Sequence, residues 1–377
     1  MIIGIPKESW RDEHRVALIP AGVFALMKAG HQVIVQADAG LGCDYTNETY
    51  DEAGAKLVFN AGEVFKRADL IVKVMPPSLP ELEYWTPGKT LFSFLAYNVL
   101  NTKLLASLSD GKCTVIGYNL IEDEMGNLPV LTTMSEIAGM LLPQIAGRFL
   151  ATQEGGRGIS LGGVAGIPAA NVVIIGAGVV GKTAAKAFIG AGANVTVMDS
   201  DLARLRDLTK WVHASVNTAL ATPYYVDRYV ETADVVVGAV MIHGQQSPHV
   251  VTEAQVRRMR KGSVILDVSI DQGGCVETSR PTTHTDPVFI RHGVIHYAVA
   301  NIPAMVARTA SQALNNVILP FVQFTADSGP KAFVAESSLR RGVYLFQGKC
   351  TQPAIGELLG WPTVQIDELL GKVYELA

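Results

Sequence analysis

The stretch that decides the fold is Val172-Val173-Ile174-Ile175-Gly176-Ala177-Gly178-Val179-Val180-Gly181. Its apolar start predicts a buried strand, and residues 182–187 that follow the glycines predict a helix. In such a strand, turn and helix, Gly176 permits the tight turn, Gly178 lets a pyrophosphate approach the backbone, and Gly181 lets the helix pack on the sheet. The pyrophosphate would meet the free N–H groups and positive dipole end of that helix. We therefore predict a dinucleotide-binding Rossmann unit, contacted by Gly176, Gly178, Val179, Val180 and Gly181.

An acidic residue completes this pattern. Asp199 lies 23 residues after Gly176, at the end of the next predicted strand, residues 195–198. A carboxylate there accepts hydrogen bonds from the ribose hydroxyls and repels a 2′-phosphate, which favours NAD over NADP. Arg204 argues in the other direction, because NADP enzymes place an arginine beside the 2′-phosphate. We predict NAD as the cofactor, with Asp199 and Arg204 in its site.

Length and composition set the class of protein. The 377 residues suffice for two or three domains, and 49% hydrophobic residues supply large cores. The net charge of −4 gives no basic surface for nucleic acid. The cysteines form no CxxC pair, so neither a zinc site nor a disulfide framework is predicted. With no signal peptide and no run of roughly 18 apolar residues, we expect a soluble, cytoplasmic protein without a metal.

Short apolar runs alternate with helical segments along the chain. Runs at residues 2–5 and 31–35 flank a helix that Pro20 opens, which predicts a βαβ unit and a parallel sheet. A second series occupies residues 172–175, 195–198, 235–240, 263–268 and 294–299. Residues 134–150 predict a long connecting helix, residues 309–324 predict another, and the tail is expected to be helical with loops.

The expected fold class is therefore α/β, with two Rossmann-like domains, parallel sheets and an interdomain cleft. Residues 1–130 with 302–377 would form a discontinuous substrate domain. Residues 131–301 would form the NAD-binding domain.

The later strands of the second series end in candidate site residues. Ligands of parallel α/β sheets bind at the carboxyl ends of the strands, where Val240-Met241, Asp271 and Asn301 follow. Asp271 stands in Ser269-Ile270-Asp271-Gln272-Gly273-Gly274-Cys275. From position alone, Asp271 is equally well a turn or cap residue.

Several motifs together resemble the alanine dehydrogenase and nicotinamide nucleotide transhydrogenase α-subunit family over essentially the full chain. They are Gly4-Ile5-Pro6-Lys7-Glu8, Arg15-Val16-Ala17, Thr133-Met134-Ser135-Glu136-Ile137-Ala138-Gly139, Gly162-Gly163-Val164, the fingerprint at 172–181, the stretch from Asp271 to Thr283, and Val299-Ala300-Asn301-Ile302-Pro303-Ala304. The last two look like alanine dehydrogenase rather than transhydrogenase.

The resemblance implies hydride transfer between NAD and an imine formed from pyruvate and ammonia, in a hexamer or dimer. It implies that Arg15 clamps the substrate carboxylate, that Met134 and Asn301 also contact the substrate, and that Asp271 is catalytic. Further residues that it places in the NAD site are Ser135, Val240, Met241, Arg280, Val299 and Asn301.

Two positions depart from the family pattern. Alanine dehydrogenases usually read Lys-Val-Lys-Glu-Pro, whose second lysine helps to bind the carboxylate, and Phe-Leu-His, whose histidine is a general acid/base. This chain has Met75 and Ala96 at those positions. Methionine cannot donate to a carbonyl and alanine cannot move a proton. Lys73 is on the same strand face as Met75, so partial replacement by Lys73 stays open.

The leading hypothesis is an NAD-dependent amino-acid dehydrogenase that converts L-alanine to pyruvate and ammonia, with a substrate altered by Met75 and Ala96. One alternative is an opine-type dehydrogenase acting on a 2-oxo acid and a larger amine. Another is a transhydrogenase-like module that binds NAD(H) without its own small substrate.

Overall fold

The computed structural model describes residues 1–95, 101–212, 216–242 and 246–374. The chain divides into two compact units. Unit 1 comprises Met1–Met134 and Val306–Ala377, and unit 2 comprises Ser135–Met305. Among the residues that the structure describes, no helix is both long enough and apolar enough to cross a lipid bilayer.

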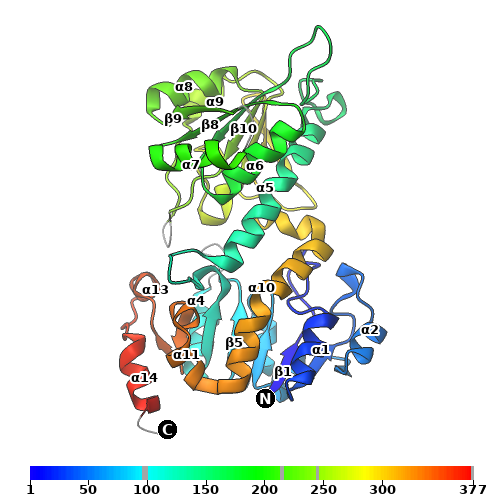
Figure 1. Ribbon diagram of the computed structural model, residues 1–377, viewed down its shortest axis with the longest axis vertical. Helices are drawn as coiled ribbons and strands as arrows, with labels where there is room; N and C mark the ends of the chain where they lie inside the picture. Colours follow the sequence, from blue (N-terminus) through cyan, green and yellow to red (C-terminus); the bar gives the residue numbers. More distant parts are fainter. Residues whose placement is uncertain (96–100, 213–215, 243–245, 375–377) are drawn as a thin grey trace. The chain divides into compact units, whose positions relative to one another are not determined.

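Unit 2 is a doubly wound α/β sheet (Figure 1). Its strand order is β12-β13-β11-β10-β7-β8-β9, so that β9, β8, β7, β10, β11 and β13 reproduce the 3-2-1-4-5-6 order of dinucleotide-binding folds. The strands are β7 (Asn171–Ile175), β8 (Asn194–Asp199), β9 (Asn217–Leu220), β10 (Val235–Gly238), β11 (Val264–Asp267), β12 (Val288–Arg291) and β13 (Val294–Tyr297). The inner strands are apolar because helices cover both faces: α6 (Val179–Gly190) and α7 (Leu202–Val212) on one, α8 (Pro223–Thr232) and α9 (Glu253–Arg258) on the other (Figure 1).

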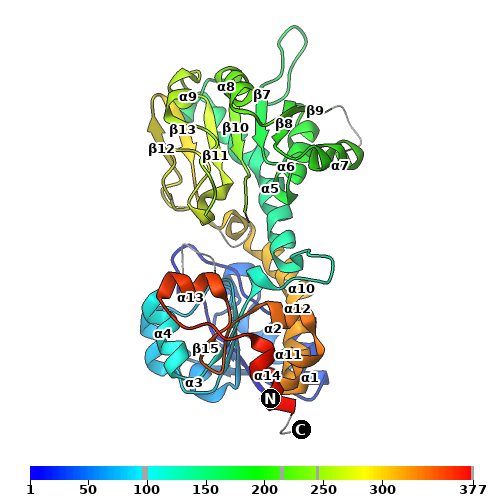
Figure 2. The same cartoon turned by 90° about the vertical axis from the view of Figure 1, so that its left-hand side faces the viewer.

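Unit 1 repeats this order in an eight-stranded sheet, β15-β14-β6-β5-β4-β1-β2-β3. The strands are β1 (Ile2–Ile5), β2 (Gln32–Gln36), β3 (Lys56–Val58), β4 (Leu70–Val72), β5 (Thr90–Ser93), β6 (Thr114–Gly117), β14 (Val343–Phe346) and β15 (Lys349–Cys350). Helices α1 (Pro20–Lys28), α2 (Asn47–Glu52) and α10 (Ala307–Ser328) lie on one side of the sheet, and α3 (Ala61–Arg67) and α4 (Thr102–Asp110) on the other (Figure 2). The remaining helices are α11 (Ala332–Ala335), α12 (Ser337–Arg341), α13 (Pro353–Leu359) and α14 (Ile366–Tyr374).

The α/β class and the two Rossmann-like sheets are thus confirmed, with two differences. β12 runs antiparallel to β13, and β14 runs antiparallel to both β6 and β15, so each sheet has a non-parallel edge. The expectation of a tail made of helices and loops is wrong for β14. Four buried apolar residues, Val343–Phe346, add a strand beside β6 there.

One long helix, α5 (Pro129–Leu150), contains the boundary between the units, which falls between Met134 and Ser135. It begins earlier than the helical spacing of residues 134–150 predicts, because Pro129 is accommodated in the first turn, where no backbone N–H is needed. In unit 2, α5 packs on α6 at Gly139: a Cβ there would lie 2.8 Å from the carbonyl oxygen of Val180.

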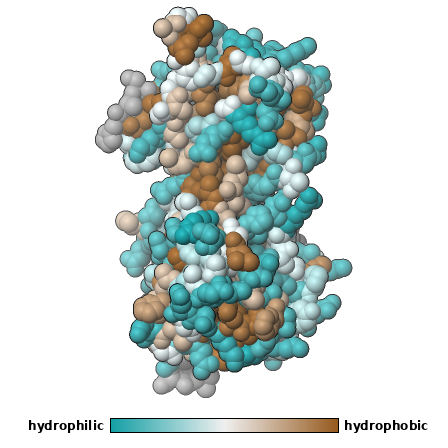
Figure 3. All heavy atoms as spheres, turned by 90° about the vertical axis from the view of Figure 1, so that its right-hand side faces the viewer, coloured by the Kyte–Doolittle hydropathy of each residue, from teal (hydrophilic) through white to brown (hydrophobic). Residues whose placement is uncertain are grey.

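A loop before β7 projects from unit 2. It contains an isolated bridge between Val164 and Ile167, whose side chains are 66% and 63% exposed. The tip of the loop is hydrophobic (brown at the top of Figure 3).

Candidate active site

The glycine turn after β7 has the geometry that a dinucleotide requires. Gly176 has φ 110°, and a Cβ there would lie 2.2 Å from the carbonyl oxygen of Ala239. A Cβ on Gly181 would lie 1.8 Å from the carbonyl oxygen of Gly176. A Cβ on Gly178, by contrast, would meet nothing within 4 Å. Gly176 and Gly181 therefore serve the turn and its packing, whereas Gly178 leaves open space at the N-terminus of α6, as an approaching pyrophosphate needs.

Asp199 lies beside this turn at the end of β8. Its Oδ2 atom accepts a hydrogen bond from the N–H of Ala177 at 2.7 Å, and its Oδ1 atom accepts one from the N–H of Asp201 at 2.9 Å. Arg204 Nη1 lies 4.0 Å from Asp199 Oδ2, and the arginine side chain is 57% exposed. The structure brings Asp199 and Arg204 together next to the glycine turn, with the carboxylate buried and the guanidinium exposed.

The ends of β10 and β11 are tied to each other. Ser269 Oγ accepts a hydrogen bond from the N–H of Val240 at 3.0 Å and lies 2.8 Å from the Val240 carbonyl oxygen. Ser269 belongs to the 3₁₀ turn Val268–Gln272 that carries Asp271. Because one hydroxyl binds both backbone groups of Val240, the predicted cofactor contact and the predicted catalytic carboxylate share a support.

The Asp267 carboxylate binds the backbone at the far end of the same loop. Its carboxylate, which is 1% exposed, accepts hydrogen bonds from the N–H groups of Cys275 and Val276 at 3.1 Å. Burial raises the pKa of Asp267, and the two backbone donors oppose that shift. Gly273 and Gly274, at φ 95° and 84°, supply the left-handed turn that returns the chain to this carboxylate.

Asp271 and Asn301 are brought together. The N–H of Asn301 lies 3.5 Å from Asp271 Oδ2. Asn301 has φ 61°, a left-handed conformation that is uncommon outside glycine. Its carbonyl oxygen also lies 3.2 Å from His284 Nε2, a contact that sequence reasoning missed.

The other predicted cofactor residues are more spread out. Met241 is 46% exposed after β10, and Val299 is 2% exposed after β13. The Arg280 guanidinium lies over the Phe289 ring at 4.5 Å, which occupies it in a cation–π contact. Ser135 is in α5, one turn before the Gly139 contact with α6. Gly139 lets α5 approach α6 closely, and sequence reasoning did not assign it this role.

Arg15, the predicted carboxylate clamp of unit 1, is 2% exposed and paired with Glu13. Its Nε donates to Glu13 Oε1 at 2.8 Å, and its Nη2 donates to Glu13 Oε2 at 2.7 Å. Its Nη1 lies 3.5 Å from the sulfur of Met134. Arg15 and Met134, both predicted to contact the substrate, are therefore in contact with each other.

Lys73 does not replace the family lysine at position 75. Its side chain is fully buried, and its Nζ lies 3.1 Å from Glu81 Oε1 and 3.2 Å from Glu8 Oε2. Burial disfavours the charged lysine, but the two carboxylates outweigh this and raise the Lys73 pKa. The Lys73 ammonium is paired within an internal ion-pair cluster, which we call the Lys73 triad (Glu8, Lys73 and Glu81).

Glu8 connects the Lys73 triad to Met75. Its Oε1 accepts a hydrogen bond from the N–H of Val74 at 2.7 Å, and its Oε2 lies 3.3 Å from the N of Met75. Burial raises the pKa of Glu8 to about 7, and the neighbouring carboxylates Glu13 and Glu81 add to the rise while Lys73 opposes it. Met75 is half-buried beside this cluster, and Ala96 lies outside the described residues.

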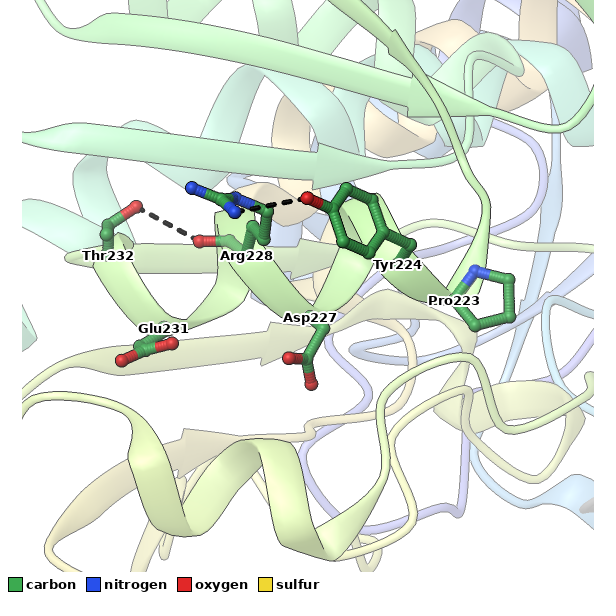
Figure 4. A pocket seen from close by; sticks show the side chains of 6 residues that line it. All are labelled: Pro223, Tyr224, Asp227, Arg228, Glu231 and Thr232. Carbon is green, nitrogen blue, oxygen red and sulfur yellow. Dashed lines mark hydrogen bonds between the residues drawn. The ribbon is translucent and has the colours of Figure 1, made fainter.

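A surface hollow of about 630 Å³ lies along α8 in unit 2. Figure 4 shows its lining: Pro223, Tyr224, Asp227, Arg228, Glu231 and Thr232, with the Arg228 guanidinium donating a hydrogen bond to the Tyr224 hydroxyl. The lining contains none of the residues predicted to bind cofactor or substrate. Its shape is open, and the site predicted from the sequence is elsewhere.

Two doubly wound sheets, one of them with the glycine turn and its acidic neighbour, define an NAD-binding oxidoreductase of the dehydrogenase class. Residues 4–138 match the family model "Alanine dehydrogenase/PNT, N-terminal domain", and residues 143–353 match "Alanine dehydrogenase/PNT, C-terminal domain". The chain belongs to the alanine dehydrogenase/PNT family, as its motifs predict.

Individual relatives are similar to the chain over nearly its whole length. The chain is 41% identical over 372 residues to alanine dehydrogenase of Staphylococcus haemolyticus, covering 98% of this chain and 99% of that protein. It is 42% identical over 374 residues to alanine dehydrogenase of Methanococcus maripaludis, covering 99% and 100%. A solved L-alanine dehydrogenase superposes with a TM-score of 0.91 at 39% identity, covering 96% of this chain and 99% of that one. A transhydrogenase from Sinorhizobium meliloti, at 24% identity and a TM-score of 0.78, shares the fold.

Proposed function

We propose that the chain is an NAD-dependent amino-acid dehydrogenase of the alanine dehydrogenase type. It would convert an amino acid, NAD and water to a 2-oxo acid, ammonium and NADH, as in the conversion of alanine to pyruvate. The observation that carries the proposal is the open space at Gly178, bordered by the start of α6 and by the turn that Asp199 holds. Similarity to alanine dehydrogenases along the entire chain favours this reaction over an opine-type reaction or a binding module.

The residues of unit 2 would hold the cofactor and order the reacting centre. The N–H groups at the start of α6 would bind the pyrophosphate, and the Asp199 carboxylate would accept from a ribose hydroxyl. NAD, when bound, supplies the hydride acceptor. Asp271 is the carboxylate next to Asn301, and we assign it the catalytic role.

In unit 1, Arg15 would bind the substrate carboxylate through charge-assisted hydrogen bonds, next to Met134. Met75 leaves this binding without the second cation of the family, and Lys73 is committed to its triad. Losing a positioned general acid/base typically costs about 10²–10⁴-fold in rate. We therefore expect slow turnover of alanine, with better turnover of a 2-oxo acid that has a larger apolar side chain to lie against the Met75 thioether.

The test is NADH oxidation by the purified protein with a panel of 2-oxo acids, first with ammonia and then with amino acids as amine donors. Tight NADH binding without NADH oxidation in any combination of 2-oxo acid and amine would refute the proposed dehydrogenase activity. Faster oxidation with amino acids than with ammonia would instead support the opine-type reaction.

A gain-of-function variant tests the placement of the substrate. Met75→Lys combined with Ala96→His restores both family groups, and we expect faster alanine deamination by about tenfold or more. Met125→Lys, at an exposed methionine of the same unit, is the matched control and should leave the rate unchanged. An unchanged rate in the double variant would place positions 75 and 96 outside the substrate site.

The protein is further proposed to be a cytoplasmic homo-oligomer, a hexamer or a dimer. All four cysteines are free thiols, which suits a reducing compartment. The projecting loop with Val164 and Ile167 offers exposed apolar surface of the kind that partners cover. Light scattering on the wild type and on Val164→Ser/Ile167→Ser measures the assembly, and a monomeric wild type would contradict the proposal.

A further inference from the structure

Arg280 of unit 2 is an exposed arginine that an aromatic ring holds. Its guanidinium carbon lies over the Phe289 ring, 4.5 Å from the ring centre. Within the described ranges of the chain, this is the contact of the Arg280 side chain, which forms no hydrogen bond and no ion pair there. An aromatic face attracts the positive charge but does not use the N–H donors as a carboxylate would. The donors of Arg280 therefore remain for a ligand.

The Phe289 ring is itself held by His296, the residue opposite it in the antiparallel pair of β12 and β13. The two ring centres are 4.9 Å apart and the planes differ by 20°. His296 is fully buried, and its Nδ1 lies 3.0 Å from the carbonyl oxygen of Val294 while its Nε2 lies 2.8 Å from Thr278 Oγ1. Burial lowers the pKa of His296 to about 4, so near neutral pH the imidazole carries no charge that would repel Arg280. We call these three residues the Arg280 stack (Arg280, Phe289 and His296).

The chain that follows Arg280 is tied to the end of β13. The N–H of Thr282 donates to the carbonyl oxygen of Ala298 at 2.9 Å, and Thr282 forms an isolated parallel bridge with Val299. In the sheet, β13 lies on one side of β7, and β8, which carries Asp199, lies on the other (Figure 2). The two sides of a doubly wound sheet serve the two halves of a dinucleotide. Since Asp199 is proposed to bind the adenosine ribose, the Arg280 stack lies on the side of the nicotinamide half.

We propose that Phe289 is a positioning residue for the cofactor: stacked on His296, its ring holds the Arg280 guanidinium near the end of β13 with donors free for the nicotinamide half of NAD(H). This inference rests on the proposed function. An arginine that is ordered before binding loses less conformational freedom when the ligand arrives. The affinity for NADH therefore depends on a ring that acts through Arg280.

Phe289→Leu is the direct test, because leucine keeps an apolar side chain in β12 but has no ring. We expect the dissociation constant for NADH, measured by titration calorimetry, to rise by about three- to tenfold, as for the loss of a cation–π contact that orders a long side chain. The dissociation constant for ADP, which lacks the nicotinamide half, should stay near the wild-type value. Ile290→Leu, at the exposed neighbour in β12, is the matched control with unchanged NADH affinity.

A conservative variant and the melting temperature separate positioning from a general structural role. Phe289→Tyr keeps the ring and should recover most of the NADH affinity. Parallel losses of NADH affinity, ADP affinity and melting temperature in Phe289→Leu would overturn the inference. If Phe289→Leu does not fold, Phe289→Met, which has a longer apolar side chain and no ring, takes its place under the same criteria.

A double-mutant cycle tests whether Phe289 acts through Arg280. Arg280→Gln alone should raise the dissociation constant for NADH, and adding Phe289→Leu should then change it little further. Fully additive effects would overturn the inference. A wild-type protein that binds no NADH would refute the proposed cofactor site and the Arg280 stack with it, whereas wild-type NADH affinity in Phe289→Leu would refute the role of Phe289 alone.

Discussion

Asp199 Oδ2 accepts a hydrogen bond from the backbone N–H of Ala177 at 2.7 Å. This bond links the end of β8 to the glycine turn after β7, so the carboxylate that we propose to bind the ribose also holds the turn that we propose to bind the pyrophosphate. The two parts of the cofactor site are therefore not independent.

Removal of the Asp199 carboxylate should weaken cofactor binding at both the ribose and the pyrophosphate positions. For Asp199→Ala we expect the dissociation constant for NADH, measured by fluorescence titration, to rise by about 10- to 100-fold, because charge-assisted hydrogen bonds are lost. The preference for NADH over NADPH should narrow, since the repulsion of a 2′-phosphate is removed. Glu231→Ala is the control, as Glu231 is an exposed carboxylate of α8 in the same unit and is not among the predicted cofactor residues. Equal NADH affinity in Asp199→Ala and wild type would contradict the assigned site.

Substitution of Gly178 and substitution of Gly176 should have opposite effects on the stability of the protein and on its affinity for NADH. Gly178→Ala places its methyl group in open space, so the melting temperature should not change while NADH affinity falls by about tenfold or more. Gly176→Ala forces a Cβ against the Ala239 carbonyl at a positive φ, so it should destabilise the protein itself. Calorimetry of the two variants measures the melting temperature, and fluorescence titration measures the affinity for NADH. Unchanged NADH affinity in Gly178→Ala would show that the pyrophosphate does not approach there.

Lys73 should behave as a structural residue. Lys73→Met leaves the Glu8 and Glu81 carboxylates buried without their shared cation, and removing one partner of a buried ion pair costs about 3–5 kcal/mol. Urea unfolding should report a loss of that order. Lys56→Met, at an exposed lysine of β3, should have little effect. A stable Lys73→Met variant with a lowered rate would mean instead that Lys73 takes part in the reaction.

The raised pKa of Glu8 predicts a pH-dependent stability difference. A carboxyl group whose pKa rises on folding from 4.5 to about 7 contributes stability that is fully present below 4.5 and is lost as the pH rises through 7. Relative to Glu8→Gln, which stays neutral, the wild type should therefore lose up to about 3 kcal/mol between pH 4.5 and pH 8. Unfolding of both proteins at several pH values measures this difference. A difference that stays constant across the range would exclude a raised Glu8 pKa.

The strands of the cofactor unit could be predicted because their local pattern and their tertiary setting agree. Four apolar residues at 172–175 fall within β7, and residues 263–268 enclose β11. Both strands are covered by helices on two faces, so each appears in the sequence as an unbroken run of apolar residues. β14 was missed because a short apolar run becomes a strand only when a partner such as β6 is available, and that partner lies more than 200 residues away.

The buried charges of unit 1 could not be predicted for a related reason. Glu8 follows β1 and Lys73 follows β4, and these strands are neighbours in the sheet although they are distant in the sequence. Their contact depends on strand order, which apolar spacing does not contain. The departure at Met75 was visible in the motif, but the fate of Lys73 required the positions of Glu8 and Glu81.

The Lys73 triad has a consequence for how this protein can evolve. The end of β4 is secured by the Lys73 ammonium and by Glu8, which binds the backbone of residues 74 and 75 rather than any side chain there. None of these contacts involves the side chain at position 75, so we expect exchange between lysine and methionine there to leave the strand end intact. Selection can alter which molecules are processed at this point without first having to restore stability, and the same property makes position 75 a good starting point for redesigning substrate preference.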